Sequence, residues 1–377
     1  MTSDLRLALA GLAALAVAMG IGRFAFTPLL PMMQGDAGLS FSQGGVLASA
    51  NYLGYLVGAL WAIRPVPAVP AIRISLAAVA LSTFGMAFVQ GMPAWIVLRF
   101  IAGFASAWTL VHVSSWCLAR FAARPGSPLP GVLFTGVGTG VVLAGLVCLA
   151  LASAGASSAQ GWMALGIIAI LLTASVVPVF RESNLAAGRQ AWARLAWDRE
   201  AVRLVLCYTA YGFSYIIPAT FVPAMAKAIV ADPKVFGWMW PFFGATAIAS
   251  TLIAGRWLAT LGARRVWMLS QLAMAVGVAA PLVIPGLAGI AIAALFVGGT
   301  FVVITLAALQ VARELYGPAS PPLMAAMTAG FGVGQVVGPL LVAQLADRGI
   351  PIALAGAALL VALSGLALGS KEKPCPT

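Results

Sequence analysis

The chain has 377 residues, of which 62% are hydrophobic and only 8% are charged. Soluble globular domains usually carry about 25% charged residues. This composition excludes an ordinary water-soluble protein and favours a chain that lies mostly inside a lipid bilayer. The formal net charge of +12 must therefore be interpreted against membrane topology before it is taken as a sign of a nucleic-acid partner.

Apolar segments of membrane-spanning length follow one another along the chain with only short polar breaks. A helix needs about 20 predominantly apolar residues to cross the hydrocarbon core. The first segment is too long for the apolar part of a secretory signal peptide and continues directly into further spans, so we interpret it as a span. The predicted spans are 5–32, 41–63, 71–90, 93–120, 128–154, 158–180, 201–229, 235–260, 265–284, 287–315, 319–345 and 350–369.

Basic residues are distributed unevenly across this topology. Most of the 21 Lys and Arg residues fall on the side of the two termini, whereas Lys227, Lys234 and Arg348 lie on the opposite side. Because positive residues are retained in the cytoplasm during insertion, we expect both termini there. The net positive charge is then explained by the orientation of the chain in the membrane and by contact with anionic lipid headgroups. We expect membrane lipid, and no nucleic acid, among the partners.

The four cysteines carry no sign of a metal site. Cys117, Cys148 and Cys207 lie within or beside apolar spans, and Cys375 lies in the tail. They form no CxxC pair and have no histidine at metal-ligand spacing, so we expect neither a disulfide framework nor a zinc site. We expect no cofactor.

Two halves of the chain resemble each other on either side of its longest polar stretch. The string TGVGTGVVLAG (135–145) matches AGFGVGQVVGP (329–339), and GIGRFAFTPLLPMM (20–33) matches GFSYIIPATFVPAM (212–225). Parallel repeats of this kind place a solute site between the halves near mid-membrane. The predicted domains are a six-helix bundle over 1–180, a cytoplasmic interdomain loop over 181–200, a second six-helix bundle over 201–370 and a cytoplasmic tail over 371–377.

Glycines in the repeated strings are spaced for close helix packing. Gly330, Gly334 and Gly338 recur every four residues on one helix face, and Gly136 and Gly140 do so in the first half. Small residues on one face let two helix backbones approach closely. A nucleotide-binding loop is the alternative, but the first string has no preceding strand and no phosphate-binding lysine.

A polar loop in the second half resembles the cytoplasmic loop motif of the major facilitator superfamily, G-x-x-x-D-x-x-G-x-R/K-R/K. The segment 255–265 reads GRWLATLGARR, with Ala259 at the acidic position of the motif. The matching residues are Gly255, Gly262, Arg264 and Arg265.

Two further segments resemble the same superfamily, and together the resemblance covers essentially the whole chain. Arg99 and Gly103 are similar to the R-x-x-x-G element of the fourth span, and MGIGRFAFTPLLPMM (19–33) resembles the first span of the YbfB/YjiJ-like branch. The resemblance implies an all-α integral membrane protein with twelve transmembrane helices in two pseudo-symmetric six-helix bundles. It also implies a transporter in the bacterial inner membrane, and we expect it to be a monomer.

The polar groups inside the predicted spans are few and cationic, because no Asp or Glu lies well inside a span. A charge at the centre of a span costs at least about 2.5 kcal/mol and normally faces a cavity or a partner. Arg23 and Arg99 are therefore candidates for binding a carboxylate or similar anion. The alternatives are that they reach the outer surface or cap backbone carbonyls.

Six further residues lie on helices that line the cavity in the superfamily, namely Asn51, Tyr55, Tyr211, Tyr215, Trp240 and Gln335. Solute contact is the prediction, and interhelical hydrogen bonding or interface anchoring is the alternative for each. Pro28, Pro31 and Pro223, with Pro218, are predicted to kink the first and seventh spans where gating movements occur.

His112 is the sole histidine and is a candidate for coupling transport to protons, since its unperturbed pKa is near 6.5. On a straight helix its side chain points about 220° away from that of Arg99, so the two cannot face one cavity. A hydrogen-bonded packing histidine is the alternative.

These observations predict a secondary active transporter that moves a small anionic or polar organic solute by alternating access, with proton symport implied by the family. Efflux of amphipathic compounds is the main alternative. A membrane-embedded enzyme is disfavoured because the chain has no HExxH helix, no GxSxG elbow and no paired carboxylates within the spans. A receptor or scaffold is disfavoured because no long loop is evident.

Overall fold

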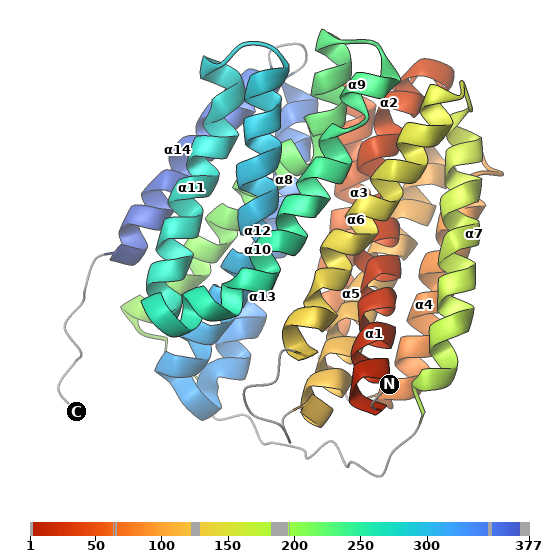
Figure 1. Ribbon diagram of the computed structural model, residues 1–377. Coiled ribbons are helices and arrows are strands. Elements are labelled where there is room, and N and C mark those ends of the chain that lie inside the picture. The colour runs from red at the N-terminus through yellow and green to blue at the C-terminus, as the bar shows by residue number, and fades with distance from the viewer. Residues whose placement is uncertain are drawn as a thin grey trace.

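The computed structural model describes residues 3–62, 64, 66–121, 129–181, 195, 197–345 and 349–369. Within these ranges all regular structure is helical (Figure 1). Most of the predicted interdomain loop and the whole predicted tail lie outside the described residues, as do Arg348 and Cys375.

Helices of the first half account for six passes through the predicted membrane. They are α1 (Ser3–Leu15), the π-helix η1 (Ala16–Arg23), α2 (Phe26–Asp36), α3 (Phe41–Trp61), α4 (Ala68–Gly85), α5 (Met92–Phe121), α6 (Leu129–Ser153), α7 (Ser158–Val176) and the short 3₁₀ turn η2 (Val177–Val179). The elements α1, η1 and α2 follow one another as a single span, Asp4–Asp36.

Helices of the second half account for the other six passes. They are α8 (Arg199–Ile229), α9 (Pro233–Phe236), α10 (Met239–Leu261), α11 (Ala263–Val283), α12 (Leu287–Tyr316), the 3₁₀ turn η3 (Gly317–Ala319), α13 (Ser320–Gln344) and α14 (Gly349–Gly369). The two sets of helices stand side by side in Figure 1, with α1–α7 in one group and α8–α14 in the other.

Eleven helical stretches in the described part of the chain are long and apolar enough to cross a membrane. The twelfth long helix, α3, is less apolar because it carries buried polar side chains, among them Ser49 and Asn51, where it packs on α5 and α13. The all-α membrane fold of twelve helices in two bundles, predicted from the sequence, is confirmed.

Local sequence signals fix where several helices begin. Ser40 before α3 and Ser157 before α7 each accept a hydrogen bond from the backbone of the glutamine three residues later, and the side chain of that glutamine accepts one from the serine backbone. This reciprocal capping satisfies two backbone N–H groups that would otherwise lack partners. Asp198 caps α8 in a similar way through the amide of Ala201.

Glycines of the repeated strings sit at the closest helix approaches in both halves. A Cβ atom added at Gly140 of α6 would lie 2.8 Å from the Cα atoms of Ala16 and Gly20 in η1. A Cβ atom added at Gly334 of α13 would lie 2.6 Å from the Phe213 nitrogen in α8. The fifth span thus packs on the first span as the eleventh packs on the seventh, which is the equivalence that the repeat predicts.

The two halves meet mainly along three pairs of helices, α2 with α8, α3 with α13 and α6 with α10, and α6 also contacts α9. Glycines also permit these contacts: Gly138 of α6 abuts Gly244 of α10, and Gly332 of α13 abuts Leu56 of α3. Because Gly138 and Gly332 are repeat equivalents, the contacts between the halves obey the same internal symmetry as the contacts within them.

A π-helical segment interrupts the first span immediately before the site described below. Over Ala16–Arg23 the backbone makes wider turns, and the amide of Phe24 bonds the carbonyl of Met19, five residues back, at 3.0 Å. Pro28, just beyond this segment, has no backbone N–H to donate to a carbonyl of the preceding turn. π-Helical turns are uncommon and are frequent at functional sites. This one ends on Arg23.

Candidate functional site

Arg23 lies at the centre of the contact between the halves, and its side chain is only 2% exposed. Its Nη2 donates a hydrogen bond to the hydroxyl of Tyr215 at 3.2 Å. The same hydroxyl also receives a hydrogen bond from Nε2 of Gln335. Three residues from η1, α8 and α13 therefore form one connected polar group across the interface.

Aromatic rings surround this polar group. The guanidinium carbon of Arg23 lies 4.0 Å from the ring centroid of Tyr55, and the rings of Tyr52 and Phe24 lie at 5.3 and 5.1 Å. These distances are within the range of cation–π attraction, which is strongest in a desolvated site. The first half thus supplies both the cation and the rings that stabilise it.

The second half supplies a stack of rings on the opposite side of Arg23. The Tyr215 ring lies between Phe301 and Phe331, with centroid separations of 5.8 and 5.6 Å and interplanar angles of 3° and 8°. Tyr211 stacks on Tyr215 at 5.1 Å, and its hydroxyl donates to the carbonyl of Phe301 at 2.6 Å. Tyr211 therefore helps to hold the stack against α12.

Several buried polar atoms around Arg23 have no hydrogen-bond partner. They include Nε of Arg23, Oε1 of Gln335 and Nε1 of Trp240, and the neighbouring Nε of Arg99 and Oδ1 of Asn51 also lack a partner. Trp240 is linked to the aromatic group through an edge contact with Phe24 at 6.2 Å. Within the described chain no carboxylate pairs with Arg23. Buried polar groups are normally satisfied, so a cluster of unsatisfied donors and acceptors around an unpaired charge marks this region as a candidate binding site.

Arg99 has a different environment. Its two terminal nitrogens donate to the backbone carbonyls of Gly22 and Arg23 at 3.1 and 2.8 Å. Asn51 donates to the Gly22 carbonyl at 3.3 Å and to the Arg99 carbonyl at 2.8 Å. Arg99 and Asn51 therefore hold the end of the π-helix in place. Their contacts require α3 and α5 to lie close together, and this depends on Gly103, where a Cβ atom would collide with the Asn51 carbonyl.

His112 lies apart from Arg23 on α5. It continues a column of rings in which Phe104, Trp108 and His112 follow one another at 5.5 and 5.6 Å between centroids. The histidine is 8% exposed, and its Nε2 and the indole nitrogen of Trp108 have no hydrogen-bond partner. Among the described residues, no hydrogen bond or ring contact joins His112 to Arg23 or Arg99.

The site is closed on the side where α2 and α8 end. Thr27 donates to the Ala219 carbonyl at 3.0 Å, and Lys227 donates to the Pro31 carbonyl at 2.6 Å. Pro31 lies inside α2, and Pro218 and Pro223 lie inside α8. Pro28, Pro223 and Gly145 border a small void between the halves at this end. The predicted gating prolines therefore lie together on the closed side.

The loop segment 255–265 lies away from the site. Gly262 adopts a φ of +79° at the turn between α10 and α11, a conformation that side-chain-bearing residues rarely adopt. Arg264 bonds the Leu368 carbonyl at 2.9 Å and pairs with Glu200 at 2.8 Å, which joins α11 to α14 and α8. A Cβ atom added at Gly255 would have no neighbouring atom within 4 Å.

Sequence reasoning missed part of the aromatic surround. Tyr52 is 2% exposed and its hydroxyl shares a hydrogen bond with Thr220 at 3.0 Å. Phe24, Phe301 and Phe331 contribute rings and carry no polar group that would mark them in an apolar sequence. A usable signal did exist for Tyr52, because it lies three residues before the predicted Tyr55 and so shares its helix face.

No metal site accompanies these groups. In the part of the chain that the structure describes, no three or more His, Cys, Asp or Glu side chains are placed to hold a metal ion. The site can therefore offer a cation, hydroxyl and amide groups, and aromatic faces.

Comparison with known proteins agrees with this architecture. The model of the family described as "Uncharacterised MFS-type transporter YbfB" matches residues 15–369. The crystal structure of a mutant of the nucleoside transporter NupG has a TM-score of 0.76 at 14% sequence identity, and the match covers 98% of this chain and 100% of that one. A second crystal structure of NupG has a TM-score of 0.71 at 16% identity, with 99% and 100% covered. No curated protein matches the chain by sequence.

Proposed function

The chain belongs to the family of uncharacterised MFS-type transporters that includes YbfB, and we propose that it carries a small anionic or polar organic solute by alternating access around Arg23. It is a multi-pass membrane transporter of the major facilitator type, and its relatives by family and by fold are transporters rather than enzymes.

The unpaired charge of Arg23 supports an anionic group on the solute. A charge buried in a membrane protein is costly unless a partner of opposite charge or several hydrogen bonds compensate it. The side-chain hydrogen bonds of Arg23 go to neutral tyrosine hydroxyls, and its Nε lacks any partner. A carboxylate or similar anion would supply both the missing charge and the missing acceptor.

The remaining groups of the site suit the rest of an organic molecule. The Gln335 oxygen can bind a donor on the solute and the Trp240 indole an acceptor, and the rings of Tyr55 and Tyr215 offer flat apolar faces. Arg99 and Asn51 act as positioning residues, because they bind the backbone that carries Arg23.

The closed side of the site supports alternating access. Among the described residues, six hydrogen bonds cross between the halves, from Arg23, Thr27, Ser42, Ser49, Tyr52 and Lys227. Those of Thr27 and Lys227 lie toward the ends of α2 and α8 that are away from the chain termini. Rocking of the two bundles would break these bonds and open that side. We further propose that the protein is a monomer in the bacterial inner membrane with both termini cytoplasmic, and that His112 is the candidate group for proton coupling.

The test is solute uptake by purified protein in proteoliposomes, with and without a pH gradient. The panel should contain organic anions, neutral sugars, hydrophobic cations and, because of the fold shared with NupG, nucleosides. We expect organic anions to be transported and Arg23→Gln to lower their apparent affinity roughly tenfold to a hundredfold. The matched control is Arg64→Gln, which makes the same change at an exposed arginine stacked on Trp61.

Two outcomes would contradict the proposal. Preferential transport of hydrophobic cations would overturn the anion site and favour efflux of amphipathic compounds. Full anion uptake by Arg23→Gln with unchanged affinity would assign Arg23 to structure alone.

A further inference from the structure

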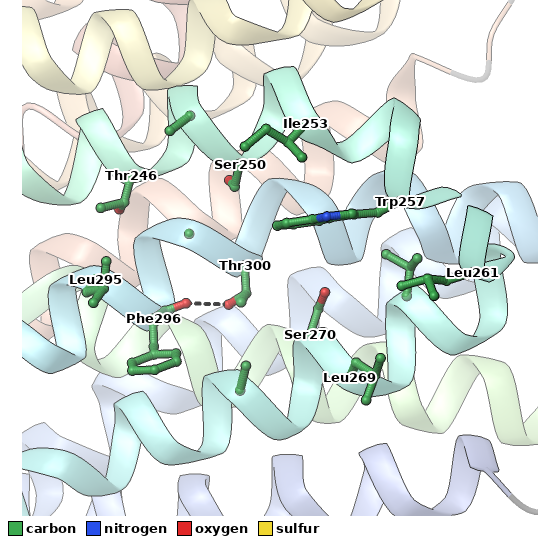
Figure 2. A pocket seen from close by; sticks show the side chains of 14 residues that line it. Thr246, Ser250, Ile253, Trp257, Leu261, Leu269, Ser270, Leu295, Phe296 and Thr300 are labelled. Carbon is green, nitrogen blue, oxygen red and sulfur yellow. Dashed lines mark hydrogen bonds between the residues drawn. The ribbon is translucent and has the colours of Figure 1, made fainter. Parts of the chain in front are cut away.

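A cavity opens on the outer surface of the second half, between α10, α11 and α12 (Figure 2). Its volume is about 550 Å³, and almost all of its wall is apolar. Figure 2 shows Trp257 along one side of the cavity and Ser250, Ser270 and Thr300 around its middle. It is separate from the Arg23 site, with which it shares no lining residue.

Small side chains on all three helices produce the hollow. Ala249 of α10, Ala273 of α11 and Gly299 of α12 face it, whereas Trp257 and Phe296 lie at its edges. Because this surface faces the bilayer, the hollow must be filled by an apolar group from the lipid phase, since empty space forfeits dispersion contacts.

The length of the cavity matches an acyl chain of one leaflet. Its α10 wall runs from Thr246 to Leu261, about 22 Å at 1.5 Å per residue. Half of the hydrocarbon core is about 15 Å thick, so the cavity extends from the membrane interface to slightly beyond the bilayer centre. Its interfacial end lies at the turn between α10 and α11, close to Gly262.

Two arginines flank that end of the cavity. Arg256 of α10 and Arg265 of α11 are each exposed, and no described residue forms a hydrogen bond or ion pair with either guanidinium group. At 100° per residue both lie about a quarter turn from the faces that line the cavity. Arg264, in contrast, is held in an ion pair with Glu200. Long arginine side chains extend to the membrane surface while their stems stay in the apolar region.

We propose that this cavity is a binding site for an anionic phospholipid, with one acyl chain between α10, α11 and α12 and the phosphate held by Arg256 and Arg265. The apolar wall fixes the chain, and the two unpaired cations select the headgroup. A zwitterionic lipid fits the wall equally well but brings no net negative charge to the arginines.

Native mass spectrometry of the intact protein in detergent tests the site, with phosphatidylglycerol and phosphatidylcholine of identical acyl chains as probes. We expect a roughly thirtyfold preference for phosphatidylglycerol, on the basis of two arginines near a membrane surface. In the double variant Arg256→Gln, Arg265→Gln this preference should disappear, whereas Arg64→Gln should retain it.

A second variant tests the wall independently of the charge. Ala249→Phe fills the cavity from its exposed rim, so both lipids should bind more weakly, and Ala245→Phe, on an exposed part of α10 outside the cavity, is the matched control. Equal binding of the two lipids by the unmodified protein, or a preference that persists in the double arginine variant, would overturn the proposal. Undiminished binding by Ala249→Phe would place the lipid elsewhere and would also overturn it.

Discussion

The two halves of the molecule share a packing scheme and differ in chemistry at the same position. Arg23 and Tyr215 are equivalent in the repeat, and they contact each other at the centre of the interface. The first half reaches this point through a π-helix, whereas α8 runs without a break from Arg199 to Ile229. Internal duplication has therefore preserved the helix contacts while the side chains that meet at the centre have diverged.

Glycine packing is the feature that both halves share, and its loss should have the largest effect. Gly140→Val and Gly334→Val each place a branched side chain against the backbone of a neighbouring helix, so each should lower the free energy of unfolding by about 3 kcal/mol or more. The measurement is the yield and thermal stability of the monodisperse protein. Gly255→Ala, at a position with open space, is the control. Tolerance of valine at only one of the two positions would show that the halves do not pack equivalently.

Substitution of Arg99 should lower stability more than substitution of Arg23, whose main effect should be on transport. Arg99→Gln leaves two backbone carbonyls at the end of η1 without their charged donor, which should cost about 3 kcal/mol of stability. Arg23→Gln removes hydrogen bonding to neutral tyrosine hydroxyls and the ring contacts of the guanidinium group, but it also removes a buried charge that no carboxylate of the described chain pairs. It should therefore change stability by about 1 kcal/mol or less. Thermal unfolding in one detergent compares the two variants. The reverse order would mean that Arg23 is the structural arginine.

Tyr215 tests the contribution of the second half to the site. Tyr215→Phe keeps the ring between Phe301 and Phe331 but removes the hydroxyl that joins Arg23 to Gln335. We expect apparent solute affinity to fall about tenfold, which corresponds to one hydrogen bond to a charged group. Uptake kinetics provide the measurement, and an unchanged affinity would confine solute binding to the first half.

Substitution of Asp198, which lies at the start of the second half, should have the smallest effect on stability. Burial acts to raise the pKa of Asp198, but hydrogen bonds from the Tyr316 hydroxyl and the Ala201 amide outweigh it and hold the pKa below its usual value. A depressed pKa means that the carboxylate stabilises the fold above the pKa of the unfolded chain, and that this contribution is lost as the pH falls through the folded value.

Thermal stability measured against pH checks this effect. Asp198→Asn keeps a capping side chain and removes the charge, so the unmodified protein should be more stable by less than about 1 kcal/mol at neutral pH. The difference should close in acid. A difference that stays constant down to acidic pH would rule out titration of Asp198 as its source.

Much of this architecture could be predicted because its determinants are local in the sequence. Span length and hydrophobicity identify most helices, and the glycine strings identify helix faces that can pack closely against a neighbour. The alignment of Arg23 with Tyr215 also followed from the repeat. Equivalent residues contact each other only where they lie beside the axis that relates the two halves. The repeated strings do not show which positions lie there.

The role of Arg99 could not be predicted, because it depends on a backbone feature. A buried arginine in a helix can bind a solute or cap carbonyl groups, and the choice depends on whether a neighbouring helix presents free carbonyls. The π-helix at Ala16–Arg23 creates that opportunity for Gly22 and Arg23. The cavity beside Trp257 was missed for a related reason, since it arises from three helix faces that no single segment reveals.

The contact between repeat-equivalent positions limits how such a site can be built. In an assembly of two identical halves, an arginine at the position of Arg23 would face a second arginine at the position of Tyr215, and two like charges would repel each other in a medium of low dielectric constant. Two tyrosines would avoid the repulsion but provide no charge. One charge paired with one neutral hydroxyl requires two different residues at equivalent places, and a single continuous chain can encode that asymmetry where a homodimer cannot.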